Sequence, residues 1–197
     1  MLAEEFLILN GTDALWQTAR PLLDVALHLE QQDDTYSWHG WQKAPIQAFL
    51  AALPSPCSLV VGVWDTFPAT STQPAQDKLV LGVVCDVAQG TVRALHTFEA
   101  LVTVGLKSVD ELEISMEDAL EIMHYARRQV APVAWALFIE KTAWDEWLFT
   151  DTEDGWTMDK GALLDTFANK GRCVLMGSQA TLHEQDESVR RLQRQSS

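Results

Sequence analysis

The stretch Lys78-Leu-Val-Leu-Gly-Val-Val-Cys-Asp-Val-Ala88 is apolar at nearly every position. A strand of this composition is usually covered on both faces, so we expect it at the centre of a β-sheet. Gln89-Gly90 then turns the chain, and residues 91–103 largely alternate between apolar and polar side chains. This pattern predicts a long antiparallel partner strand, with or without a bulge, that carries His96 on its apolar face and Glu99 on the other.

Working outward from this hairpin, apolar runs predict further strands at 6–9, 58–64, 133–139 and 172–177. Helical spacing and capping residues predict helices at 13–30, 42–53, 115–130, 143–149 and 159–170, with an interruption at Pro21. Residues 31–41 and 67–77 read as loops. We therefore expect one α/β (α+β) domain over residues 1–182, with a mixed, mostly antiparallel central sheet flanked by helices on both faces. Residues 183–197 are polar and predict a frayed tail.

The charge balance narrows the choice of partners. The chain has 28 acidic and 14 basic residues and a net charge of −14. Such a surface repels phosphate backbones, which argues against nucleic acid, and it favours a basic protein or peptide unless the charge serves solubility alone. No apolar run approaches the roughly 20 residues of a membrane span.

The cysteines and the N-terminus predict a compartment. The three cysteines, Cys57, Cys85 and Cys173, are an odd number and each lies in or beside an apolar run. This placement is typical of reduced, buried thiols. The first residues lack the basic and apolar regions of a secretory signal, so we expect a cytoplasmic protein.

The stretch Ala162-Leu-Leu-Asp-Thr-Phe-Ala-Asn-Lys-Gly-Arg-Cys-Val-Leu-Met-Gly177, together with the order of the predicted elements, resembles the GNAT (GCN5-related N-acetyltransferase) family. In that family a helix ends in glycine and leads into the last strands, as Lys170-Gly171-Arg172 does here. The resemblance implies acetyl-CoA or another acyl-CoA as cofactor and transfer of the acyl group to a small amine or a protein. It places the cofactor loop after the strand that ends near residue 103, at Val104, Gly105 and Leu106.

Several residues depart from the family pattern. The family loop is Gln/Arg-x-x-Gly-x-Gly/Ala, whereas residues 104–115 contain one glycine and three carboxylates, and Glu117 follows closely. Negative charge there opposes pyrophosphate binding. Phe167 takes the place of a tyrosine that often acts as general acid, and phenylalanine has no proton to donate. Arg172 replaces the usual aromatic residue. It therefore stays open whether any cofactor binds.

His96 and Glu99 are the candidate catalytic bases, although a hydrogen-bonded core histidine and a surface glutamate are the more ordinary interpretations. Glu121 and His124 have the E-x-x-H spacing of helical di-iron sites. A second such pair is missing from the sequence, so we expect no metal site.

Eight tryptophans are many for 197 residues. One group, Trp144, Trp147 and Trp156 with Asp145, mixes rings with carboxylates, which suits a basic partner unless the rings form core. Two hypotheses follow. The chain is a divergent, non-catalytic interaction module with an acidic, tryptophan-rich surface, or it is an active acyl-CoA-dependent N-acyltransferase. The oligomeric state is not predicted.

Overall fold

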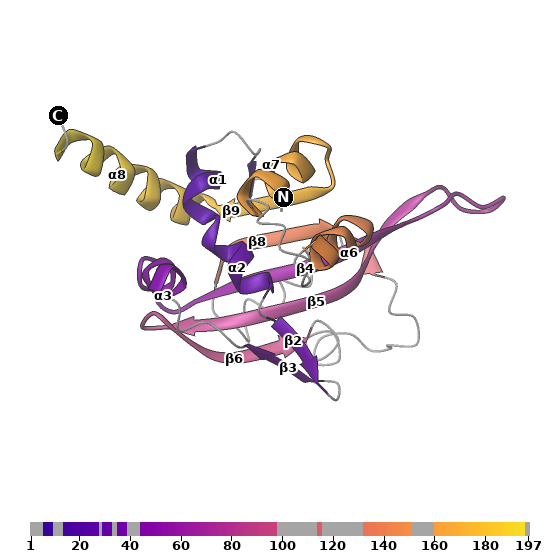
Figure 1. Cartoon of the computed structure of the whole chain (residues 1–197), viewed down its shortest axis with the longest axis horizontal. Coiled ribbons are helices and arrows are strands. Elements are labelled where there is room, and N and C mark those ends of the chain that lie inside the picture. The colour runs from indigo at the N-terminus through magenta and orange to yellow at the C-terminus, as the bar shows by residue number, and fades with distance from the viewer. Residues whose placement is uncertain are drawn as a thin grey trace.

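The fold is mixed α+β, with the central sheet and its helices shown in Figure 1. The computed structural model describes residues 6–9, 14–27, 29–32, 35–38, 44–97, 114–115, 132–150 and 160–195. Expected elements at 98–103 and 116–130 lie outside these residues, as do Glu99, Val104, Gly105, Leu106, Glu121, His124 and Trp156.

The described central sheet has seven strands, and six of them follow the order β1-β9-β8-β4-β5-β6. β4 and β8 are parallel, and the other pairs are antiparallel. The expectation of a mixed, mostly antiparallel sheet is therefore confirmed. The strands are β1 Phe6–Leu9, β4 Cys57–Phe67, β5 Gln76–Ala88, β6 Thr91–Thr97, β7 Ile114–Ser115, β8 Val133–Glu140 and β9 Cys173–Ser178.

The apolar strand β5 is covered on both faces, as expected, but it lies beside the outer strand β6 rather than at the sheet centre. Val83 and Cys85 belong to the core beneath the helices, whereas Val84 is buried on the opposite face. Alternation of side chains along a strand requires this division. Neighbouring β4 shows the same pattern, with Leu59 and Val61 in the helix-side core and Val60 buried between them.

The β5–β6 hairpin turns at Gln89 and Gly90, which have φ angles of 54° and 71°. Positive φ at both turn residues is the geometry that matches strand twist in two-residue hairpins. The register of β5 and β6 shifts where Asp86 pairs with Ala94 and Val87 with Val92, which leaves Arg93 as an extra residue. This bulge turns Val92 toward the helix-side core. His96 pairs opposite Val84, on the other face.

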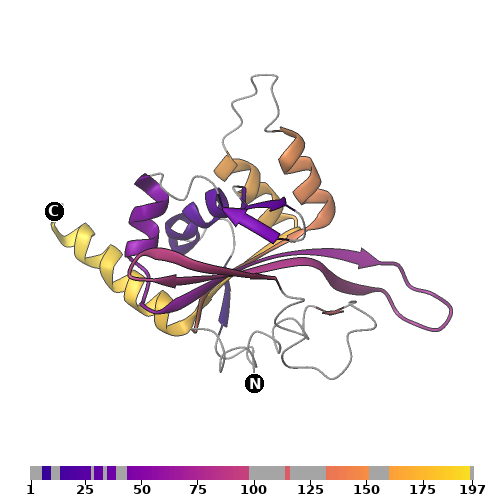
Figure 2. The ribbon, with the colours of Figure 1, turned by 90° about the horizontal axis from the view of Figure 1, so that it is seen from below.

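Helices cover one face of the sheet (Figure 2). They are α1 Ala14–Ala19, α2 Pro21–Leu27, α3 Ala44–Ala51, α6 Lys141–Thr150 and α7 Lys160–Asn169. The buried side chains that they contribute to a common core with the strands include Trp16, Leu22, Val25, Ile46, Leu50, Ala143, Trp147, Leu164 and Phe167. Of the helix expected at 115–130, residues 116–130 lie outside the described residues, and Ser115 belongs to the strand β7 instead.

Two N-terminal features differ in how well the sequence anticipates them. The helical run breaks between α1 and α2 at Pro21, as predicted, because proline lacks the N–H that a continuous helix needs. The expected loop at 31–41 is wrong in part, since β2 Leu29–Gln32 and β3 Thr35–Trp38 form an antiparallel pair. Four-residue strands give too short a pattern to be recognised by periodicity.

Helix α7 ends as predicted at Gly171, whose φ of +70° is easily adopted only by glycine. The amides of Gly171 and Arg172 donate to the carbonyls of Ala168 and Phe167. α7 is also tied to α1, because Asp165 accepts a hydrogen bond of 2.5 Å from the indole of Trp16. These contacts set the position of Arg172, the first residue after the cap.

The expected frayed tail is wrong, because Gln179–Gln195 form a helix, α8. Ser178 acts as its N-cap, with Oγ accepting from the Thr181 amide at 3.3 Å. Leu182 is buried against the sheet, near Gly177. Farther along, Glu187 pairs with Arg191 four positions later. The polar composition that suggested fraying instead supports a solvent-exposed helix through such pairs, and α8 projects from the body (Figure 1).

Candidate functional site

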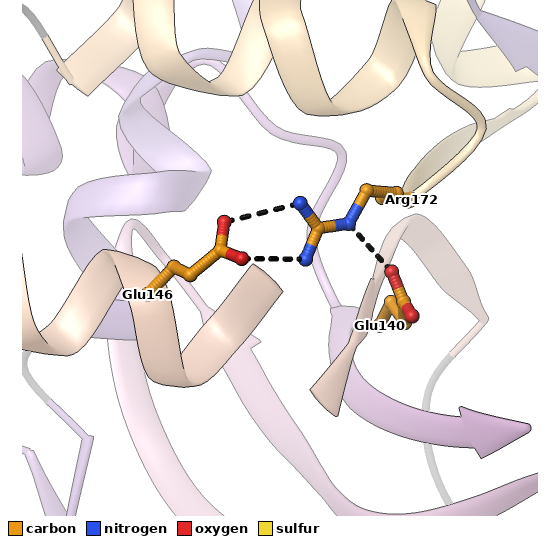
Figure 3. Close-up of polar contacts among 3 residues, drawn as sticks. All are labelled: Glu140, Glu146 and Arg172. Carbon is orange, nitrogen blue, oxygen red and sulfur yellow. Dashed lines mark hydrogen bonds and ion pairs between the residues drawn. The ribbon is translucent and has the colours of Figure 1, made fainter. Parts of the chain in front are cut away.

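Arg172 joins two carboxylates that come from different elements (Figure 3). Its Nε donates to Glu140 Oε2 at 2.6 Å, at the end of β8. Its two terminal nitrogens donate to Glu146 on α6, at 3.0 and 3.2 Å. The planar guanidinium fork matches a carboxylate with two parallel bonds, which a lysine ammonium cannot do.

The local backbone and an aromatic ring position this guanidinium. The Arg172 carbonyl accepts from the Glu140 amide at 2.8 Å, which holds the two residues side by side. The guanidinium carbon lies 5.2 Å from the centre of the Phe167 ring. The hydrogen bonds that Arg172 donates to Glu146, and next those to Glu140, raise the pKa of Arg172 above its ordinary value. Phe167 itself is 3% exposed, so it serves as core and as a support for Arg172.

A second ion pair lies at the start of α6. Lys141 Nζ is 2.7 Å from Asp145 Oδ2, one helical turn away. The hydrogen bond to Asp145 is the main cause that raises the pKa of Lys141, and the charge of Asp65 on β4 adds to it. α6 therefore carries one basic side chain, Lys141, against the acidic Asp145 and near Asp65 of β4.

These residues make up one group, which we call the α6 charge cluster: Asp65, Glu140, Lys141, Asp145, Glu146 and Arg172. Four carboxylates meet two cations, so the cluster keeps a net charge of −2 after its internal pairing. Asp145 and Glu146 remain 43% and 53% exposed. Each of these two carboxylates can therefore be reached from solvent.

The tryptophans expected to share this surface are placed differently. Trp147 is 2% exposed and belongs to the core, so its assignment to a partner surface is wrong. Trp144 is half-buried and meets Trp147 edge-on, with ring centres 5.5 Å apart. Helical spacing turns one side of α6 toward the sheet, and both tryptophan rings pack on that side. Asp145 does lie at the surface, and Trp156 lies outside the described residues.

A second polar group spans three strands on the sheet face opposite the helices. Asp86 on β5 accepts from Ser58 Oγ on β4 at 3.0 Å. His96 Nε2 on β6 lies 3.0 Å from the other oxygen of Asp86. The His96 side chain is 35% exposed. The predicted base is therefore hydrogen-bonded, but to a residue that the sequence analysis did not single out. The sequence did contain a sign of this role, because Asp86 is the one carboxylate in the apolar run 78–88.

The arrangement of Ser58, Asp86 and His96 does not activate the serine as a nucleophile. Ser58 is fully buried, and the carboxylate rather than the imidazole holds its hydroxyl. A serine nucleophile needs a base such as histidine beside it and access to substrate. Burial, and next the charge of Asp86, raise the pKa of Cys57 to about 11 and of Cys85 to about 12. Both are free thiols. This group therefore stabilises the sheet as hydrogen-bonded polar side chains.

The strand that an acyl-CoA cleft would need has neighbours on both sides. β8 pairs with β4 from Ser58 to Trp64 and with β9 along 135–139. β6, which leads toward the expected cofactor loop, is separated from β8 by β4 and β5. Along these paired strands β8 therefore has no open edge, and the expected cofactor loop lies outside the described residues.

The described residues contain no group of three or more histidine, cysteine or carboxylate side chains placed to hold a metal ion. Among the described helices, none has the length and apolar character that crossing a membrane requires. No protein-family model, no curated protein and no solved structure matches the chain.

Proposed function

We propose that this chain is an interaction module that binds a basic protein or peptide at the α6 charge cluster. The observation that carries the proposal is the excess of two negative charges that remains after Lys141 and Arg172 have made their ion pairs. A lysine or arginine of the partner would find carboxylates that are already ordered. Ordered acceptors lose less side-chain entropy on binding than mobile ones do.

The α6 charge cluster has two parts, one held by Arg172 and one around the exposed Lys141. Arg172 holds Glu140 and Glu146 between β8, α6 and the cap of α7. Within the described part of the chain, Asp145 pairs with the exposed Lys141 and Asp65 adds its charge there, so two carboxylates share one cation. In the sequence, α6 is followed by three more carboxylates, Asp151, Glu153 and Asp154.

The alternative, an acyl-CoA-dependent N-acyltransferase, is supported by the element order and by the stretch from Ala162 to Gly177. The pairing of β8 on both edges gives it no support. The Ser58–Asp86–His96 group gives the acyltransferase no support either, because the Ser58 hydroxyl is buried. We therefore place the interaction module first.

The test is binding of a fluorescent lysine-rich peptide, followed by anisotropy. Asp65→Asn together with Asp145→Asn removes two charges from the cluster and leaves the Arg172 ion pairs intact. We expect this variant to bind several-fold more weakly than the wild type, and wild-type binding to weaken with added salt, since exposed charges are screened beyond about 8 Å at physiological ionic strength.

The matched control removes two carboxylates from α8, through Glu184→Gln and Glu187→Gln, and so reaches the same net charge. It should bind like the wild type. Equal weakening in both variants would mean that only net charge matters, and the cluster would not be the site. Thermal stabilisation by acetyl-CoA or longer acyl-CoAs, with no response to the peptide, would instead favour the acyltransferase.

A further inference from the structure

The second half of α8 has the opposite charge from the rest of the chain. Residues 188–197 contain three arginines and no acidic residue. Of the 14 basic residues, 11 are therefore left to balance 28 acidic ones, so the remainder of the chain has a net charge of −17. Arg190, Arg191 and Arg194 are all exposed. The helix thus presents a local positive surface on an acidic molecule.

The three arginines share one side of the helix with a glutamate. Positions 187, 190, 191 and 194 have the i, i+3, i+4 and i+7 spacing of a single helical face. Glu187, Arg190, Arg191 and Arg194, which we call the arginine stripe, line a hollow of about 260 Å³ and have a net charge of +2. Pockets that enclose drug-sized ligands measure about 300–1,000 Å³. The hollow therefore suits individual side chains of a larger partner.

Pairing within α8 leaves positive charge accessible in the stripe. Arg191 lies 3.5 Å from Glu187, and the two side chains are 75% and 52% exposed. Water screens an ion pair this exposed, so it holds the arginine weakly. Glu187 is also 3.7 Å from His183. Within the described part of α8 and the sheet, Arg194 meets no carboxylate.

The helix dipole explains only one of these arginines. A cation in the last turn stabilises a helix, and Arg194 lies there. The effect fades within one turn, whereas Arg190 and Arg191 lie farther back along α8. Stability of the helix alone therefore does not require three arginines on one face.

The arginine stripe lies away from the acidic body. α8 is held to the sheet at the buried Leu182 and projects from there, on the opposite side of the molecule from α6 (Figures 1 and 2). At a rise of about 1.5 Å per residue, Arg190 and Arg194 lie about 12 and 18 Å along the helix from Leu182. The Debye length in physiological salt is about 8 Å. An anionic partner can therefore reach the stripe while its repulsion by the body is screened.

We propose that the arginine stripe binds a carboxylate-rich segment of a partner protein. A guanidinium binds a carboxylate through two parallel hydrogen bonds. Arg190 and Arg194 are separated by about 6 Å along the helix axis, which is close to the spacing of about 6.6 Å between alternate residues of an extended segment. Glutamates or aspartates at such positions would each meet one arginine.

Charge complementarity favours a short acidic segment over a nucleic acid. A nucleic acid has negative charge along its whole length, at one charge for about every 1.7 Å of duplex. Its backbone would continue past the stripe toward the first half of α8, which contains Glu184 and Asp186, and toward the acidic body. An acidic segment of a protein can end within the stripe and avoid that repulsion.

The test is fluorescence anisotropy of a labelled oligoglutamate peptide, titrated with the full chain at low salt. Arg190→Gln with Arg194→Gln removes two positive charges and introduces residues of good helix propensity. We expect this variant to bind several-fold more weakly than the wild type. Arg191→Gln alone should weaken binding by a smaller factor, because one charge is lost. Circular dichroism checks that α8 is retained in each variant.

The matched control is Arg93→Gln with Lys170→Gln, which removes two exposed cations from β6 and from the residue after α7. This control should bind oligoglutamate like the wild type. A wild-type chain that does not bind the peptide at low salt, or equal weakening in the control and the stripe variant, overturns the proposal.

Two further outcomes would assign the arginine stripe to another occupant and equally overturn the proposal. Tighter binding of a labelled oligothymidylate of matched charge would indicate a nucleic acid. Self-association of the chain alone, measured by sedimentation velocity and lost in Arg190→Gln with Arg194→Gln, would indicate a second copy.

Discussion

Arg172 holds the carboxylate of Glu146 in a two-point ion pair, with distances of 3.0 and 3.2 Å between two nitrogens and two oxygens. The two residues are 26 positions apart, on the cap of α7 and on α6. This contact, together with the bond to Glu140, joins α6, the cap of α7 and the C-terminal end of β8. It gives the α6 charge cluster its fixed centre.

Replacement of Arg172 by alanine should lower the free energy of unfolding by about 1–2 kcal/mol, because hydrogen bonds to charged groups contribute most where they are shielded and Glu146 is half exposed. Arg172→Lys should recover only part of the loss, since an ammonium cannot form the fork. Urea unfolding measures both. Arg194→Ala on α8 serves as an exposed arginine control, and a loss of the same size there would contradict a specific role for Arg172.

Removal of the Asp86 carboxylate should cost more than removal of the Ser58 hydroxyl. Asp86→Ala removes the carboxylate that accepts from the buried Ser58 hydroxyl and also contacts His96, at a cost of about 1–3 kcal/mol, whereas Ser58→Ala costs about 1 kcal/mol. Asp86→Asn keeps an acceptor and should lie between them. Chemical denaturation of the two single variants and the double variant gives the coupling energy. A coupling near zero would mean that the 3.0 Å contact contributes nothing.

Two glycines should tolerate alanine poorly, for different reasons. A Cβ on Gly62 would lie 2.6 Å from the Phe138 ring, so Gly62→Ala should destabilise by about 1–3 kcal/mol through overpacking. Phe138→Leu should relieve part of that cost. Nothing lies within 4 Å of a Cβ on Gly171, but its φ is +70°, so Gly171→Ala should cost about 1 kcal/mol through backbone strain. Rescue of Gly171→Ala by a smaller neighbour would contradict this distinction.

The folded chain should lose stability as the pH rises above about 9. Burial raises the pKa of Cys57 from 9.0 to about 11 and that of Cys85 to about 12. Between the ordinary and the raised values the unfolded chain releases thiol protons that the folded chain retains, so unfolding is favoured as pH increases. Unfolding curves at rising pH measure the effect, and Cys57→Ala with Cys85→Ala should flatten the slope. Rapid alkylation of the native thiols at neutral pH would contradict their burial.

The sequence predicts elements with long or capped patterns well. The run of 78–88, the turn at Gln89-Gly90, the break at Pro21 and the glycine cap of α7 are all observed. Short or polar elements were missed, as β2, β3 and the far end of α8 show. Their stability comes from pairing and from i, i+4 contacts, which leave a weak periodic signal.

The candidate site was predicted only in part. Asp145 lies at the surface, as expected, and His96 lies within hydrogen-bond distance of Asp86. Trp147, in contrast, is part of the core. The partners that define both polar groups, Arg172 and Asp86, come from distant parts of the chain. Sequence spacing contains no information on which strands are neighbours, so these contacts could not be derived from it.

By itself the sequence determined the α+β class, the acidic surface and the basic composition of residues 188–197, because these depend on composition and on local patterns of apolar residues and turns. The tertiary structure alone decided that β8 lies between β4 and β9, that Arg172 joins Glu140 to Glu146, and that α8 projects from the body. The physical reason is that strand order and long-range ion pairs depend on how elements pack, and many packings satisfy the same local pattern.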